Sequence, residues 1–262
     1  MSGYLICNNS VKSFSLAILL FFQLFRLSAQ GGEIVSDIFI TEKDSLPFQF
    51  ITPGNSDTLK KYPLVIWLHG KGERGMDNKK QMTLIKKWLP DSLQKDKYKS
   101  FLLAPQCSED RYWNNYDKLA DKITFDTITP QIQITLMQLI DTLMIQYPVD
   151  PDRIYVMGIS MGGFGAFDLI TRYPDFFAAA VPICGGADPR MVNEISKTPV
   201  WAFHGANDNV VNVRHTYSIM SLLDSEKHKF SKLDNMGHDA WNKAFKEPEL
   251  LKWMMLNNKN DN

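Results

Sequence analysis

The chain has 262 residues, and its 29 lysine and arginine residues balance 29 aspartate and glutamate residues. A formal net charge of zero offers no basic surface for phosphate backbones, so we expect no nucleic-acid partner. With 44% hydrophobic residues, the chain is long and apolar enough for one domain with a substantial core.

The first 29 residues form a separate segment. Lys12 precedes the apolar run "SFSLAILLFFQLF", and small residues up to Ala29 follow it. This order predicts a signal peptide cut near Ala29, with an uncleaved anchor as the alternative. Arg26 interrupts the run before the roughly 20 apolar residues that a transmembrane helix needs. We therefore expect a periplasmic or secreted protein, with residues 30–262 as one domain and no stable membrane association after cleavage.

Short apolar runs then alternate with helical patterns. The first two runs, "EIVSDIFITEK" and "LPFQFITP", alternate apolar and polar residues, which predicts a solvent-facing hairpin at a sheet edge. The next six are mostly continuous apolar runs, typical of strands buried on both faces of a parallel sheet. These runs are "YPLVIWLHG", "SFLLAPQC", "RIYVMGIS", "FAAAVPICGG", "TPVWAFHGAND" and "HKFSKLD".

Helical patterns separate these runs. They cover residues 81–94, about 129–147, 161–174, 213–226 and 247–258. Strands alternating with helices predict an α/β fold, a mostly parallel sheet of about eight strands flanked by helices. In open sheets of this kind ligands bind outside the carboxyl ends of the strands, so functional residues are expected there.

Gly158-Ile159-Ser160-Met161-Gly162 joins a predicted strand to a predicted helix. Glycines in this spacing and context are typical of a nucleophile elbow, a sharp turn that exposes the serine hydroxyl. The N–H of Met161, at the helix start, would donate to a developing oxyanion. The alternative is a phosphate-binding turn, but neither a GxGxxG pattern nor a Walker lysine supports it.

A serine hydroxyl needs a base beside it, and the chain has five histidines. His238 lies in the loop "DNMGHDAW" after the last predicted strand, where the order Ser, Asp, His places the base. His69 and His204 end strands, so we interpret them as turn-shaping and packing residues. His215 and His228 lie in helical or polar surroundings without a loop signal.

The acid and the second oxyanion donor should follow other strands. Asp208 comes after the penultimate strand in "FHGANDNVV" and is predicted to orient the base; a turn or N-cap aspartate is the alternative. The loop "LHGKGERG" is expected to supply the second donor, Lys71 N–H in preference to Gly70 or Gly72. The histidine spacing supports no metal site, and we expect no cofactor.

Taken together, these motifs resemble those of a known protein superfamily. Residues from about 35 to 256 resemble an α/β-hydrolase. Four motifs are more specific and narrow the resemblance to particular groups within that superfamily: "WLHGKGERGMDN", "LLAPQC", "PICGGAD" and "GHDAW". They resemble secreted esterases of carbohydrate esterase family one and the bacterial phospholipase/carboxylesterase or predicted-peptidase group. The resemblance implies that Ser160, Asp208 and His238 form a catalytic triad.

The same resemblance implies further site residues. Lys71 and Met161 would supply the backbone donors, and Trp113 would line the acyl site, with an ordinary loop anchor as an equal alternative. The usual strand order of the fold separates the strands that end at Cys107 and Cys184 by two others, so we expect reduced thiols rather than a disulfide.

The resemblance also bears on the substrate. Between "PICGG" and "TPVWAF" there is room for one short helix, so we expect a catalytic domain without a large cap. An open cleft suits acetyl or feruloyl groups on a polysaccharide, or a small ester, and implies a serine carboxylesterase of the acetyl xylan or feruloyl type. The alternatives are a serine peptidase of the same fold and a catalytically inactive hydrolase fold that binds carbohydrate.

Overall fold

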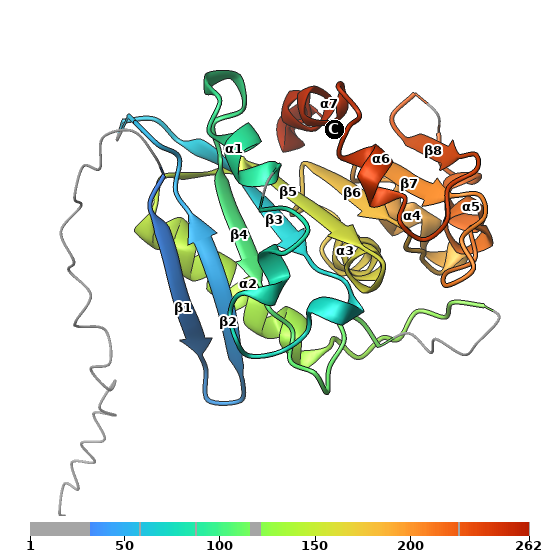
Figure 1. Ribbon diagram of the computed structural model, residues 1–262, viewed down its shortest axis with the longest axis horizontal. Coiled ribbons are helices and arrows are strands. Elements are labelled where there is room, and N and C mark those ends of the chain that lie inside the picture. Colours follow the sequence, from blue (N-terminus) through green and yellow to red (C-terminus); the bar gives the residue numbers. More distant parts are fainter. Residues whose placement is uncertain (1–31, 58, 87, 116–121, 225, 262) are drawn as a thin grey trace, which may run out of the picture.

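A computed structural model of the chain describes most of its residues after the N-terminal segment (Figure 1). The described residues are 32–57, 59–86, 88–115, 122–224 and 226–261. The expected signal peptide, residues 1–29, lies outside them. Within the described ranges, no helix has both the length and the apolar character needed to cross a membrane.

Eight strands form one sheet in the order β1-β2-β4-β3-β5-β6-β7-β8 (Figure 1). All pairs from β4 through β8 are parallel, whereas β1–β2 and β2–β4 are antiparallel. The predicted fold class, the mostly parallel sheet of an α/β-hydrolase, is confirmed. The strands are β1 Ile34–Ile40, β2 Ser45–Ile51, β3 Tyr62–Leu68, β4 Phe101–Pro105, β5 Val149–Ile159, β6 Ala179–Ile183, β7 Trp201–Gly205 and β8 Lys229–Leu233.

The first two strands form the predicted hairpin at the sheet edge. β1 is largely exposed, with Ile34, Ile38 and Ile40 facing solvent. β2 is mostly buried, because it pairs with β4 on its other side and packs Phe48 and Phe50 into the core.

Alternate residues of the central strands enter two separate cores. Leu64 and Ile66 of β3 face one core, and Val65 and Trp67 face the other, as the two-residue period of a strand requires. Residues of α2 to α5 cover the first face, and residues of α1, α6 and α7 cover the second. The helices are α1 Leu89–Leu93, α2 Gln131–Gln146, α3 Met161–Arg172, α4 Val192–Ile195, α5 Arg214–Met220, α6 Trp241–Ala244 and α7 Leu250–Leu256.

Two predicted helices are much shorter than their patterns: of residues 213–226 only α5, Arg214–Met220, is helical, and residues 81–94 are shortened further. Residues 81–94 were expected to be helical, but only a 3-10 turn, η2 (Lys80–Met82), and α1 form there. Pro90 lies in the first turn of α1, where its missing N–H does no harm. A helix running through Pro90 would lose a hydrogen bond and clash with the preceding turn, so the helix begins there instead.

The connection from β6 to β7 is short. It holds only a 3-10 helix, η4 (Pro189–Met191), and α4, so the expectation of no large cap is confirmed for this connection. Cys107 follows β4 and Cys184 follows β6, with β3 and β5 between these strands, and no disulfide joins the two. That the thiols are reduced in the protein remains a prediction.

Candidate active site

The turn between β5 and α3 has an unusual backbone. Ser160 sits between Ile159, the last residue of β5, and Met161, the first of α3, with φ 50° and ψ −115°. A positive φ is unfavourable for any residue with a Cβ, and such strain persists only where the surroundings enforce it. The N–H of Ser160 donates to the Ile183 carbonyl over 2.8 Å, which ties the turn to the end of β6.

Two glycines allow this turn because the backbone closes in on them. A Cβ added to Gly158 would lie 2.2 Å from the Gly162 carbonyl oxygen. A Cβ added to Gly162 would lie 1.9 Å from the Leu68 carbonyl oxygen at the end of β3. The glycines of the motif therefore let the first turn of α3 press against both β5 and β3.

The structure brings together the three side chains predicted to form the triad. Ser160 Oγ lies 3.0 Å from His238 Nε2, and His238 Nδ1 lies 2.7 Å from Asp208 Oδ2. The three residues follow β5, β8 and β7, all at the carboxyl edge of the parallel sheet. Asp208 is buried, whereas Ser160 and His238 are partly exposed and can reach a ligand.

Asp208 is held by four donors. Its Oδ1 accepts the N–H groups of Val210 and Val211, each over 2.9 Å, and its Oδ2 contacts His238 Nδ1 and His204 Nε2. Burial raises the pKa of Asp208, but these hydrogen bonds outweigh it and hold the pKa well below its ordinary value. The carboxylate is therefore ionised and fixes the proton of His238 on Nδ1, which leaves Nε2 to accept from the serine.

Two other histidines, His69 and His228, have structural roles. For His69 this is the role that its sequence position suggested. His69 Nε2 accepts the Cys107 N–H over 2.9 Å and its Nδ1 lies 2.7 Å from the Gly70 carbonyl, so the ring is neutral with the proton on Nδ1. Burial lowers the pKa of His69 to about 4. Burial likewise lowers the pKa of His228 to about 4, and its Nδ1 accepts the Val200 N–H.

His204 does more than the packing role that its sequence position suggested. Its ring contacts Asp208, which lies four residues further along "FHGAND". That spacing was the available signal, a histidine at a strand end just before the candidate acid. Trp241 was also missed; its ring lies edge-on to His238 with centroids 5.5 Å apart.

The two predicted backbone donors occupy equivalent places. Lys71 is the first residue of the 3-10 helix η1 (Lys71–Glu73), and Met161 is the first residue of α3. The first N–H groups of a helix have no acceptor within that helix, so both remain available to a ligand oxygen. The contact of Gly162 with the end of β3 brings the start of α3 beside the loop that carries Lys71.

Glu73 and its neighbours brace this loop. Glu73 Oε2 accepts the Gly70 N–H over 2.9 Å, while Oε1 is buried and has no hydrogen-bond partner. Burial raises the pKa of Glu73 from 4.5 to about 7. From the end of β4, the buried Gln106 donates to the Glu73 carbonyl and to Asp77 Oδ1, and accepts the Asn78 N–H. The motifs "GKGERGMDN" and "APQC" are therefore in direct contact.

Trp113 is an anchor of the loop after β4. Its indole is 1% exposed and donates to the His69 carbonyl over 3.1 Å. It packs so closely on α3 that a Cβ added to Gly165 would lie 2.5 Å from the Trp113 Cβ. This placement fits the loop-anchor alternative, and it leaves almost no indole surface for lining an acyl site.

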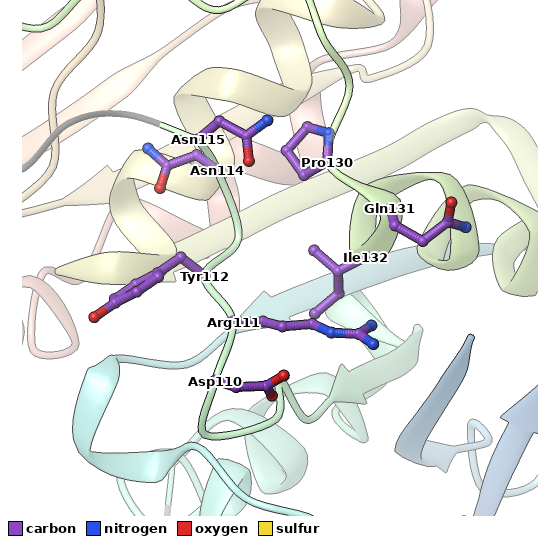
Figure 2. A pocket seen from close by; sticks show the side chains of 8 residues that line it. All are labelled: Asp110, Arg111, Tyr112, Asn114, Asn115, Pro130, Gln131 and Ile132. Atoms are coloured by element: carbon purple, nitrogen blue, oxygen red, sulfur yellow. The ribbon is translucent and has the colours of Figure 1, made fainter. Parts of the chain in front are cut away.

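A hollow of about 370 Å³ lies beside that loop, against the start of α2 (Figure 2). Arg111 extends toward Ile132 in this view. None of the three triad residues lines the hollow. Its lining residues are Asp110, Arg111, Tyr112, Asn114, Asn115, Pro130, Gln131 and Ile132.

In the described part of the chain, one group of side chains has metal-ligand character. The donor atoms of Cys184, Asp208 and His238 lie within 4.8 Å of one another. Asp208 and His238 are already hydrogen-bonded to each other, and burial raises the pKa of the Cys184 thiol to about 12. A protonated thiol is a poor ligand, so the group is better explained as the acid–base pair of the site with a packed cysteine.

Proteins with similar sequences include members named as carboxylesterases and as an acetylxylan esterase. A profile of the phospholipase/carboxylesterase family matches residues 55–249. A poly(3-hydroxyalkanoate) depolymerase C of Paucimonas lemoignei is 40% identical over 53 residues, 20% of this chain and 13% of that protein. A bifunctional acetylxylan esterase/xylanase of Neocallimastix patriciarum is 28% identical over 98 residues, 37% of this chain and 14% of that protein.

A solved structure extends the similarity over most of the described chain. The structure of a thermostable esterase superimposes with a TM-score of 0.76 at 28% identity, covering 86% of this chain and 63% of that one. The chain thus spans about an eighth to a seventh of the two curated relatives, and less than two thirds of the esterase. The architecture and the sequence are therefore similar to those of esterases over the part of each protein that this chain covers.

Proposed function

The chain belongs to the phospholipase/carboxylesterase family, and we propose that it is an exported serine ester hydrolase that removes acyl groups from polysaccharide. The observation that carries the proposal is the hydrogen-bonded series from Ser160 through His238 to Asp208. Ester hydrolysis requires a nucleophile, a base and a means to orient that base, and these contacts supply all three.

In the proposed reaction, Ser160 Oγ attacks the ester carbonyl carbon while His238 Nε2 takes the hydroxyl proton. The carbonyl oxygen becomes an oxyanion and accepts the N–H groups of Met161 and Lys71. The C–O bond to the alcohol then breaks, and His238 returns the proton to the departing oxygen. Water attacks the acyl-enzyme by the same route, with His238 as base, and releases the acid and Ser160.

The substrate class rests on the short β6–β7 connection and on one relative. A site without a large cap over that side admits an acyl group that is displayed on a long polymer. The acetylxylan esterase relative acts, by its name, on such a polymer. We propose acetyl groups on xylan as the first candidate and feruloyl groups as the second.

Export is proposed from the N-terminal sequence. A charged residue, an apolar run and small residues at the end are the features of a cleaved signal peptide. Expression of the complete sequence in a bacterium, followed by mass measurement of the protein outside the cytoplasm, tests it. A mature chain that begins next to Ala29 is expected, and a full-length product retained with the cells would contradict export.

The activity is tested with the full chain and its Ser160→Ala variant on acetylated xylan, methyl ferulate and a short aryl acetate. Serine-dependent release from xylan or ferulate supports the polysaccharide substrate and identifies the acyl group. Release from the aryl acetate alone keeps the serine mechanism and rejects the polymer. Equal turnover by Ser160→Ala on every ester rejects the mechanism.

A further inference from the structure

The penultimate strand brings a second histidine to the carboxylate of the proposed triad. His204 is the fourth residue of β7 and is fully buried. Its Nε2 lies 3.2 Å from Asp208 Oδ2, the same oxygen that His238 Nδ1 contacts at 2.7 Å. Two imidazole rings therefore converge on one carboxylate oxygen.

The surroundings of His204 Nε2 determine where its proton lies. Besides Asp208 Oδ2, this nitrogen lies 2.9 Å from the Val211 carbonyl oxygen. A carboxylate and a peptide carbonyl can only accept hydrogen bonds. An unprotonated Nε2 would face two oxygen lone pairs in a buried position, which is unfavourable, so Nε2 carries a proton that is shared between the Val211 carbonyl oxygen and Asp208 Oδ2.

The other side of the ring is fixed by a helix. His204 Nδ1 lies 2.6 Å from Thr216 Oγ1 of α5, and the Thr216 hydroxyl is within 2.7 Å of the Gly185 carbonyl. The ring is thus held between β7, α5 and the end of β6. It cannot turn away from Asp208 without breaking these contacts.

On the premise of the proposed serine mechanism, we propose that His204 is a positioning residue for the triad acid. Asp208 lies in the loop after β7 and has no strand partner of its own to fix its side chain. Backbone N–H groups hold its Oδ1, and the Nε2–H of His204 holds its Oδ2 from the side. With both oxygens fixed, Oδ2 stays directed at His238 throughout the proton transfers.

The test compares two variants of His204 with a matched control. His204→Gln keeps an N–H donor close to the place of Nε2, and His204→Leu removes it. The control is His228→Leu, because His228 is also buried at the sheet and bonds a backbone group, Val200 N–H, away from the triad. For each full-length variant, kcat and KM on an aryl acetate, the labelling rate with a fluorophosphonate and the Tm are measured.

Loss of the donor should lower kcat about 10- to 100-fold with little change in KM, as expected for one hydrogen bond to a charged group. His204→Gln should recover most of that loss, and His228→Leu should leave kcat and the labelling rate near those of the original chain. A folded His204→Leu variant with unchanged kcat and labelling would overturn the proposal, as would a control variant that loses as much kcat.

A second measurement works even if His204→Leu does not fold. Long-range proton–nitrogen correlation spectra of the imidazole rings in the original chain report which nitrogen of His204 is protonated, and the signals missing in His204→Gln assign them. A protonated Nε2 is expected, and a bare Nε2 rejects the proposed donor. This result does not depend on turnover, so it stays separate from a failure of the ester-hydrolase proposal, which Ser160→Ala reveals.

Discussion

The side chain of Gln106 donates to the backbone carbonyl of Glu73 over 3.2 Å. This bond joins the end of β4 to the loop after β3, which carries the proposed donor Lys71. Gln106 is fully buried and also bonds Asp77 and the Asn78 N–H. One side chain thus holds the loop at three points between Glu73 and Asn78.

Replacing Gln106 with leucine should therefore destabilise the protein and impair ester turnover together. The buried carbonyl of Glu73 and the half-buried N–H of Asn78 would lose their partner, which we expect to lower the free energy of unfolding by about 2 kcal/mol. Urea denaturation of the variant measures this. Gln138→Leu, at an exposed position of α2, is the control and should change stability by less than about 0.5 kcal/mol. Equal effects of the two substitutions would show that the bracing contacts are unimportant.

Ser160→Ala and Ser160→Gly should separate activity from strain. Both remove the hydroxyl, so both should abolish ester turnover. Alanine keeps the Cβ at φ 50°, so its Tm should stay near that of the original chain, whereas glycine adopts this φ without penalty and should be more stable than alanine by about 1 kcal/mol. Thermal denaturation of the pair measures the difference. A glycine variant less stable than the alanine variant would mean that the turn is not strained.

Asp208→Asn should lower kcat by about four orders of magnitude while the protein stays folded. An asparagine side chain cannot carry the negative charge that stabilises protonated His238, and its amide group would favour the wrong ring tautomer. Steady-state kinetics on an aryl acetate test this, with circular dichroism to verify folding. A loss of less than about tenfold would remove Asp208 from the proposed triad.

Glu73 should make stability fall as pH rises. Because burial raises its folded pKa from 4.5 to about 7, the native state binds the proton more tightly than the unfolded state between these values. The free energy of unfolding should therefore decrease from pH 4.5 to pH 7, by an amount on the order of 3 kcal/mol at most. Denaturation curves at several pH values measure the slope, and Glu73→Gln should flatten it. An unchanged slope in that variant would assign the pH dependence to other groups.

Reducing agent should leave the Tm unchanged, since no disulfide joins Cys107 to Cys184. Thiol titration after denaturation, without reductant, should detect both cysteines. A titration that finds neither, together with a lower Tm in reductant, would show that the two pair after all.

The positions of the strands along the chain and the place of the nucleophile could be predicted because they depend on local patterns. Runs that are apolar on both faces identify buried parallel strands, and the glycines around Ser160 identify the sharp turn. Asp208 and His238 followed from chain order, since each must come after a particular strand of this fold.

The remaining site features depend on contacts between segments that the sequence does not place side by side. Gln106 meets the loop after β3 only because β4 lies next to β3 in the sheet, although it comes later in the chain. His204 reaches Asp208 across a turn rather than along a helix. The contact between the two side chains therefore cannot be predicted from helical periodicity. The indole of Trp113 is buried because Gly165 leaves room for it on α3, a pairing that residue type alone does not predict.

The short connection between β6 and β7 has a kinetic consequence. A segment of this size, with α4 packed onto the core through Ile195, supplies no lid that must open before products leave. For turnover by the proposed mechanism, we expect this connection to impose no conformational gate on product release. Solvent would also reach the acyl-enzyme readily, which favours transfer of the acyl group to water over its transfer to a second alcohol.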